Sequence, residues 1–228
     1  MIGTLTTARG FRCQSTLRRV AFDFVLFADP MTVGSRGPDA RMGSRFRLST
    51  FINSEYGLDS FWDHGQDQTS RLTEGSATDR LRCSEVSGPL TLLRGHPCTS
   101  SAAVGPATNV SYGFNARLHI APATPDAGPE AAQSASARPV LLSKAILQHP
   151  DVPLAWDIDG AALTRRGATT PHFSAPAIGD DALFRGDRLW APAPRHHGRV
   201  NVAFVGGHVL SSADPRAEPT WDWAYTPE

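Results

Sequence analysis

The most constraining feature of this sequence is an amphipathic segment near its N-terminus. Its apolar residues recur every three or four positions, which places them on one face of an α-helix. They are Cys13, Leu17, Val20, Ala21, Phe24 and Ala28. Pro30 ends the pattern, because a proline ring cannot continue the helical hydrogen-bond ladder. Phe22, Val25 and Phe27 widen the apolar surface, so we expect the rest of the chain to cover one side of this helix.

The composition indicates a globular chain with much irregular structure. Of its 228 residues, 40% are hydrophobic and 19% are charged, and 20 are Gly and 18 are Pro. This length accommodates one domain with appendages, and so much Gly and Pro favours short strands joined by long connections. The 22 basic residues balance 22 acidic ones, which argues against nucleic acid as a partner. No run of about 18 apolar residues occurs, so we expect the chain as written to be soluble.

A second strong pattern lies near the C-terminus. Apolar residues alternate with polar or small ones in residues 200–204, Gly206 and Gly207 predict a two-residue turn, and a return strand begins at Val209. We therefore predict a β-hairpin in which Phe204 lies opposite Val209. Another buried strand is predicted for residues 152–158.

Four segments, taken in order, resemble one known family. They are residues 8–29 (ARGFRCQSTLRRVAFDFVLFAD), 81–84 (LRCS), 111–115 (SYGFN) and 196–209 (HHGRVNVAFVGGHV). The first is similar to the second half of the long N-terminal helix of bacterial type II pseudopilin-like, prepilin-type proteins. The last resembles the motif of one branch of that family, a His followed after nine residues by Asp-Gly. The two short segments are similar to the Cys-Pro-Ser and Ser-Tyr-Gly-Tyr-Asn segments of the same branch.

The resemblance implies an α+β, pilin-like fold, in which an N-terminal amphipathic helix packs on an antiparallel β-sheet with long loops. Residues 1–29 would form the distal half of the pilin-type helix. Residues 30–228 would form the globular head, with an exposed loop at 121–138, where Ala, Pro and Ser dominate. Residues 1–7 stand where family members have a leader and an apolar half-helix, from which we expect a truncated form or a misplaced gene start.

The function that the resemblance implies is a non-catalytic structural or assembly subunit of a type II secretion or type IV pilus-like system. Such a protein is exported to the periplasm or cell surface and, when full length, is anchored in the inner membrane. Its expected partners are other pilin-like subunits, contacted through the N-terminal helix. The sequence agrees in lacking a G-x-S-x-G elbow, an H-E-x-x-H pair and a Gly-rich phosphate loop before a helix.

Gly206 departs from the family motif, which has Asp at this position. A glycine cannot replace a metal ligand or an acid catalyst, because it carries no carboxylate, but it readily replaces Asp in a turn that needs positive φ. Ten residues of extended strand span about 33 Å, which separates His196 from Gly206. We therefore interpret His196, Gly206 and Gly207 as a structural motif.

Two groups of side chains are candidate metal ligands. His196, His197 and His208 carry imidazoles, which zinc favours, but adjacent strand residues point to opposite faces. Asp157 and Asp159 precede a glycine as in a calcium loop, although the other EF-hand ligands are missing. Calcium at the two aspartates is the cofactor we keep as a candidate, against a solvated strand end.

Cys83 and Cys98 are candidate disulfide partners among the three cysteines, which lack metal-ligand spacing. A bridge between them would close a short loop and stabilise the fold by roughly 3 kcal/mol. Two unpaired thiols are the alternative.

Trp221, Trp223 and Tyr225 share the parity of a strand, on which all three would lie on one face. That aromatic face packs on the body of the fold or contacts a partner. The alternative function is therefore an exported surface module that binds a glycan or a protein.

Overall fold

A computed structural model describes residues 2–29, 45–56, 81–86, 110–121, 138–166, 168, 172–179 and 183–227, and the fold is given for these residues. Its regular elements begin with a long helix and end with a β-hairpin. They are α1 (Ile2–Ala28), α2 (Leu48–Tyr56), β1 (Tyr112–Asn115), the 3₁₀ helix η4 (Ala116–Leu118), β2 (Ile120–Ala121), β3 (Arg138–Pro139), the 3₁₀ helix η5 (Lys144–Gln148), β4 (Pro153–Asp157), α3 (Gly160–Arg165), β5 (Phe173–Ser174), the 3₁₀ helix η6 (Arg185–Asp187), β6 (Val200–Phe204) and β7 (Val209–Ser212).

The central sheet has five strands in the order β5-β1-β4-β6-β7. Three of the four pairings are antiparallel, and only the edge strand β5 runs parallel to its neighbour β1. All residues of β1, β4 and β6 are buried, so both faces of the sheet are covered. This arrangement confirms the predicted class at the coarse level, an α+β fold with an N-terminal helix and a mostly antiparallel sheet.

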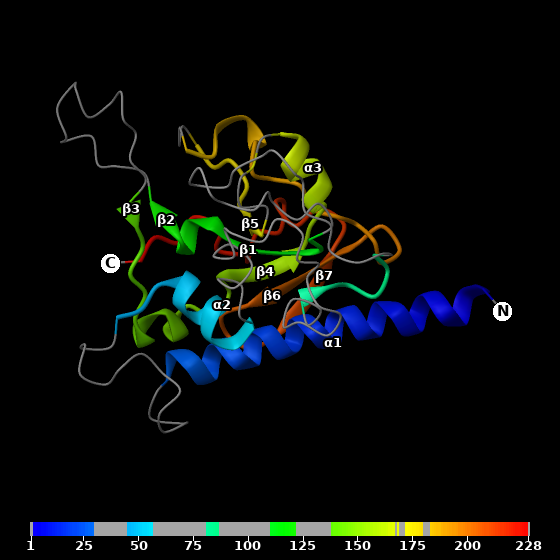
Figure 1. Cartoon of the computed structure of the whole chain (residues 1–228), viewed down its shortest axis with the longest axis horizontal. Helices are drawn as coiled ribbons and strands as arrows, with labels where there is room; N and C mark the ends of the chain where they lie inside the picture. The colour runs from blue at the N-terminus through cyan, green and yellow to red at the C-terminus, as the bar shows by residue number, and fades with distance from the viewer. Residues whose placement is uncertain are drawn as a thin grey trace, which may run out of the picture.

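Helix α1 lies along one face of the sheet, beside β6 and β4, and its first turns extend past the head (Figure 1). The predicted stripe from Cys13 to Ala28 is at most 3% exposed at each of its positions, which confirms the periodicity. Phe24 meets Phe51 edge to face at 5.2 Å, so α2 covers the distal part of the same stripe. The helix ends at Ala28, before Pro30. No described helix is both long and apolar enough to cross a membrane.

The opposite face of the sheet carries a second apolar cluster. Along β6, Ala203 faces the α1 side, whereas Val202 and Phe204 face the other side. There Trp221 and Trp223 pack on β4 and β6, and Trp223 donates its indole hydrogen to the carbonyl of Pro215 at 2.8 Å. The sheet is therefore the middle layer of the fold.

The predicted β-hairpin is present, but its predicted two-residue turn is wrong. Ala203, not Phe204, pairs with Val209. The longer turn has a physical reason: the amide of Gly206 donates to the carbonyl of Pro150 at 3.1 Å, which draws the hairpin tip onto the segment before β4. Positive φ occurs at Gly207, at +87°, whereas a Cβ atom on Gly206 would lie 2.9 Å from the Pro150 oxygen. Gly206 thus allows a close backbone approach rather than positive φ.

Other expectations have mixed outcomes. The buried strand predicted for residues 152–158 is confirmed as β4. Ala121 pairs with Arg138 in the small β2-β3 sheet, and residues 122–137 of the predicted loop lie outside the described residues. The division at residue 29 stays a prediction.

Two phenylalanines of α1 provide a matched test of this packing. Phe24 is fully buried, whereas Phe22 is 58% exposed. We expect Phe24→Ala to lower the free energy of unfolding by about 3–5 kcal/mol, because it leaves a cavity between α1 and α2. Phe22→Ala should change it by less than about 0.5 kcal/mol. Urea unfolding followed by circular dichroism measures both, and equal effects would contradict the placement of α1.

Candidate functional site

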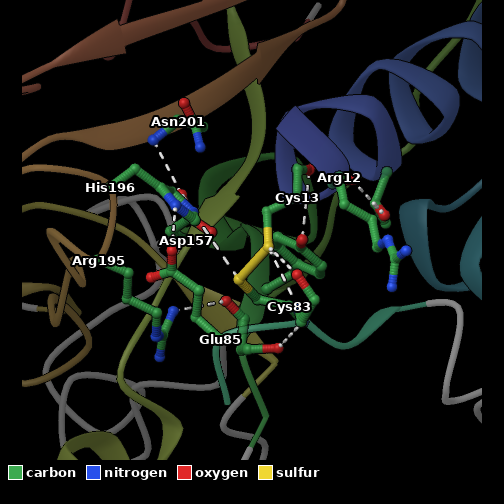
Figure 2. The surroundings of a disulfide bond; sticks show 12 residues. Arg12, Cys13, Cys83, Glu85, Asp157, Arg195, His196 and Asn201 are labelled. Carbon is green, nitrogen blue, oxygen red and sulfur yellow. Dashed lines mark hydrogen bonds and ion pairs between the residues drawn. A yellow bond between two sulfur atoms is a disulfide. The ribbon is translucent and has the colours of Figure 1, made fainter. Parts of the chain in front are cut away.

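The chemistry-bearing side chains gather where α1 passes over the end of β4 and the start of β6 (Figure 2). Cys13 comes from α1, Cys83 and Glu85 from the segment 81–86, Asp157 from the end of β4, and His196 from the turn before β6. We call these five residues the histidine cluster. It joins parts of the chain that are far apart in sequence.

A disulfide joins Cys13 to Cys83, with their Cα atoms 5.2 Å apart. Both residues are at most 1% exposed. The predicted bridge between Cys83 and Cys98 is therefore wrong, because the Cys83 sulfur is already bonded; Cys98 itself lies outside the described residues. Sequence spacing favours closure of a short loop, but the packing of α1 on the sheet decides which sulfurs meet.

Hydrogen bonds hold both ends of this disulfide in place. The amide of Ser84 donates to the Cys13 sulfur at 3.2 Å, and the amide of Cys83 donates to the Ser111 hydroxyl at 2.6 Å. The Tyr112 hydroxyl donates to the Cys13 carbonyl at 3.3 Å. The start of β1 thus contacts both half-cystines.

The imidazole of His196 lies between two carboxylates and beside the disulfide. Its Nε2 atom is 3.3 Å from Asp157 Oδ2 and 3.8 Å from the Cys83 sulfur, and its Nδ1 atom is 3.4 Å from Glu85 Oε1. A hydrogen bond to Asp157 is the largest cause that raises the pKa of His196 above 6.5, and burial opposes it. The two carboxylates therefore favour the charged imidazolium over the neutral ring.

A tight turn sets the orientation of this histidine. His196 and Arg199 exchange backbone hydrogen bonds, of 3.3 and 3.0 Å, across His197 and Gly198. His197 and Gly198 both have positive φ, at 54° and 77°, as a type I′ hairpin turn requires. The chain reverses at this point, so His196 is buried and its neighbour His197 is exposed.

Asp157 is fully buried and only partly satisfied. Its Oδ2 atom accepts the amide of Asn201 at 2.9 Å, whereas its Oδ1 atom has no hydrogen-bond partner among the described residues. Arg195 lies close by and donates to the carbonyls of Ser111 and Ile158. Burial lowers the pKa of Arg195, while the charge of Asp157 raises it.

The predicted metal ligands do not meet as expected. Asp159 caps α3 by accepting the Ala162 amide at 2.9 Å, whereas Asp157 faces His196, so the two aspartates have separate partners, and calcium at this pair stays a prediction. His208 stacks on Phe204 at the hairpin tip, with ring centroids 4.6 Å apart. His196, His197 and His208 therefore form no common site.

Of the two roles expected for the C-terminal aromatic residues, packing on the body of the fold is confirmed for Trp221 and Trp223. Trp221 and Trp223 are 8% and 5% exposed, since their rings pack against Trp156 and Phe204 on the far face of the sheet. Turns replace the predicted strand there. Tyr225 is half-buried against His149, at 4.5 Å between ring centroids.

Chemically, the histidine cluster combines a covalent link with a buried ion triad. Cys13, Cys83 and His196 are each at most 8% exposed, so the fold largely covers the sulfurs and the imidazole. Sequence reasoning missed Glu85 and the pairing of Cys13 with Cys83. The position of Cys13 on the buried stripe was a usable signal for the pairing.

The disulfide leads to a direct prediction. A bridge between residues separated by 70 positions is expected to contribute about 4 kcal/mol by restricting the unfolded chain. Reduction in the presence of a chelator should lower the free energy of unfolding by about this amount. Peptide mapping without reductant should recover a Cys13–Cys83 linked peptide. Cys98→Ser is the control and should leave both results unchanged; a Cys83–Cys98 peptide would contradict the structure.

The ion triad leads to a prediction of pH dependence. Because the folded-state pKa of His196 is raised above 6.5, its contribution is fully present below pH 6.5 and is lost as pH rises through the folded value. His196→Gln removes the cation that contacts both Asp157 and Glu85, so we expect a loss of about 1.5–3 kcal/mol in acid. The difference between the two proteins should shrink as pH rises.

The comparison with His196→Gln isolates one histidine. Burial lowers the pKa of His119 to about 4 and that of His172 to about 3. These two histidines therefore make the folded protein less stable as pH falls, in the variant as in the wild type. Their effect cancels in the difference of unfolding free energies measured from pH 5 to 9. A constant difference over this range would show that His196 does not change its charge on folding.

Comparison with known proteins assigns no family to the chain. No protein-family model, no curated protein and no solved structure matches it.

Proposed function

We propose that this protein is a pilin-like structural or assembly subunit of a type II secretion or type IV pilus-like envelope system. In this proposal α1 is the distal half of the N-terminal helix, and the sheet with its loops is the globular head. The protein acts without catalysis, and the full-length form is exported and held in the inner membrane. Its partners are other pilin-like subunits.

One observation carries this proposal: the four segments that resemble the family meet at the histidine cluster. Segment 8–29 supplies Cys13 and segment 81–84 supplies Cys83, which are joined by the disulfide. Segment 111–115 supplies hydrogen bonds to both half-cystines, and segment 196–209 supplies His196 beside the Cys83 sulfur. Because these four segments meet in space, we expect them to act together. Their shared role would be to attach α1 to the head.

The outer face of α1 supplies an interface for such a subunit. Phe11 and Phe22 are 67% and 58% exposed, and they lie about three helical turns apart on the same side of α1. The buried stripe faces the sheet, so these two rings point away from the head. Exposed aromatic rings on a helix that is fixed to its head favour helix-to-helix contact with a neighbouring subunit.

The alternative function, an exported module that binds a glycan or a protein, depended on the C-terminal aromatic residues. Trp221 and Trp223 are buried in the core, so they leave Tyr225 as the one partly exposed ring of the three. The structural role is therefore the better supported proposal.

Site-specific photo-crosslinking in the native host tests it. The full gene is expressed with a benzophenone amino acid at Phe22 or, as a matched control, at Leu141, which is 44% exposed and lies outside α1. We expect position 22 to crosslink to a second copy or to another protein that begins with a long apolar helix, identified by mass spectrometry. Position 141 should give at least tenfold less of this product.

Two results would contradict the subunit role. Equal crosslinking from positions 22 and 141 would show no preference for the outer face of α1. Crosslinking from position 22 only to proteins without an N-terminal apolar helix would assign that face to a different kind of partner. The double variant Phe11→Ser with Phe22→Ser should lose the product and keep the unfolding free energy of the wild type.

A further inference from the structure

We propose that the histidine cluster has a second, reduced state in which Cys13, Cys83, His196 and Asp157 bind one zinc-class ion. This inference is independent of the proposed function, because it concerns only the chemistry of the cluster. It assigns a ligand to side chains that the sequence did not group as metal ligands.

The donor atoms are already gathered. The two cysteine sulfurs and a ring nitrogen of His196 lie within 4.8 Å of one another, which within the described residues is the one group of three His, Cys, Asp or Glu side chains this close. Two thiolates and an imidazole form a donor set that zinc and similar ions prefer over calcium or magnesium. These three ligands could not be grouped from the sequence, because they come from segments that are far apart along the chain.

Asp157 is the fourth ligand in this proposal; it contacts His196 but is not one of the three residues whose donor atoms already lie within 4.8 Å of one another. Its Oδ2 atom is 3.3 Å from His196 Nε2, and its buried Oδ1 atom has no hydrogen-bond partner among the described residues. A fully buried carboxylate oxygen without a partner is costly, and a cation would satisfy it. With this oxygen, the site has the four protein ligands that are typical of closed, structural zinc sites.

Glu85 orients the histidine for this role. Its Oε1 atom is 3.4 Å from His196 Nδ1. A carboxylate this close to Nδ1 favours the tautomer with its proton on Nδ1, which leaves Nε2 free to bind a metal, and such partners commonly strengthen metal binding by histidine. Nε2 is the atom that faces Asp157 and Cys83.

The protein also provides for a thiolate at Cys13. The amide of Ser84 donates to the Cys13 sulfur at 3.2 Å, and the Ser84 hydroxyl lies 3.4 Å from the same atom. Hydrogen bonds to a charged acceptor are stronger than those to a neutral one, so both contacts favour the thiolate. A thiolate is the form of cysteine that binds metals.

A dithiol reductant gives two electrons and two protons to the Cys13–Cys83 disulfide and becomes a disulfide itself, which leaves two thiols. The metal ion then displaces the two thiol protons and the proton on His196 Nε2, so binding should tighten as pH rises. The sulfurs move apart to about 3.8 Å, the edge of a tetrahedron with metal–sulfur bonds of about 2.3 Å.

The consequence is that α1 stays attached to the sheet in both redox states. The disulfide makes the link when the cluster is oxidised, and the metal makes it when the cluster is reduced. Either link joins the same two segments at the same position on α1.

Metal titration of the full chain tests the proposal. The purified protein is reduced under argon, freed of small thiols and titrated with Co²⁺ alone and then with Zn²⁺. We expect one ion per chain, thiolate-to-cobalt charge-transfer absorption, and d–d bands of tetrahedral intensity that zinc abolishes. The oxidised protein should bind no ion, and zinc should raise the Tm of the reduced protein but not that of the oxidised protein.

Matched variants assign the ligands. Cys13→Ser and His196→Gln should weaken zinc binding by more than about 100-fold, and Glu85→Gln by about 10–100-fold. Cys98→Ser and His197→Gln change a third cysteine and an adjacent exposed histidine, so they should leave binding unchanged. Circular dichroism checks that each variant folds. X-ray absorption at the zinc edge counts the sulfur ligands of the reduced wild type without any substitution.

Three outcomes would overturn the proposal. The first is that the reduced wild type binds no stoichiometric ion. The second is that X-ray absorption finds a coordination sphere without two sulfur ligands. The third is that folded Cys13→Ser or His196→Gln binds as tightly as the wild type, or that Cys98→Ser abolishes binding.

Discussion

Burial of one face of α1 on the central sheet is the interaction on which the rest of the structure depends. An isolated helix of this kind is marginal in water, so its stability comes from the apolar stripe that ends at Ala28. The stripe meets β6 and β4 on one side and the phenylalanines near α2 on another. It also sets where Cys13 lies over the sheet, and the disulfide can form only at that position.

The histidine cluster then fixes the position of α1 more narrowly than apolar packing does. Apolar side chains tolerate small shifts, whereas a disulfide and a triad of Asp157, His196 and Glu85 require particular atoms to meet. Removal of these charges from water costs free energy that their attraction only partly recovers. We infer that the triad contributes more to the uniqueness of the arrangement than to its net stability.

Features that depend on neighbouring residues in the sequence could be predicted, whereas features that depend on contacts between distant segments could not. The stripe of α1, its end before Pro30 and the strand β4 are local patterns, and each was predicted. The hairpin register and the partner of Cys83 depend on contacts between distant segments, and both predictions were wrong. Glu85 carried no pattern of its own; only the fold places it beside the histidine.

His196 and Gly206 lie on either side of β6 and make different packing contacts. His196 precedes β6 and points toward α1 and the disulfide, while Gly206 follows β6 and lets Pro150 approach its backbone. A side chain at position 206 would push against Pro150, and loss of the imidazole would remove the cation that contacts both Asp157 and Glu85. Spacing in such a motif therefore reflects the length of the strand between two packing contacts. Chemistry enters at the histidine end alone, where sulfur, nitrogen and carboxylate oxygen share one buried volume.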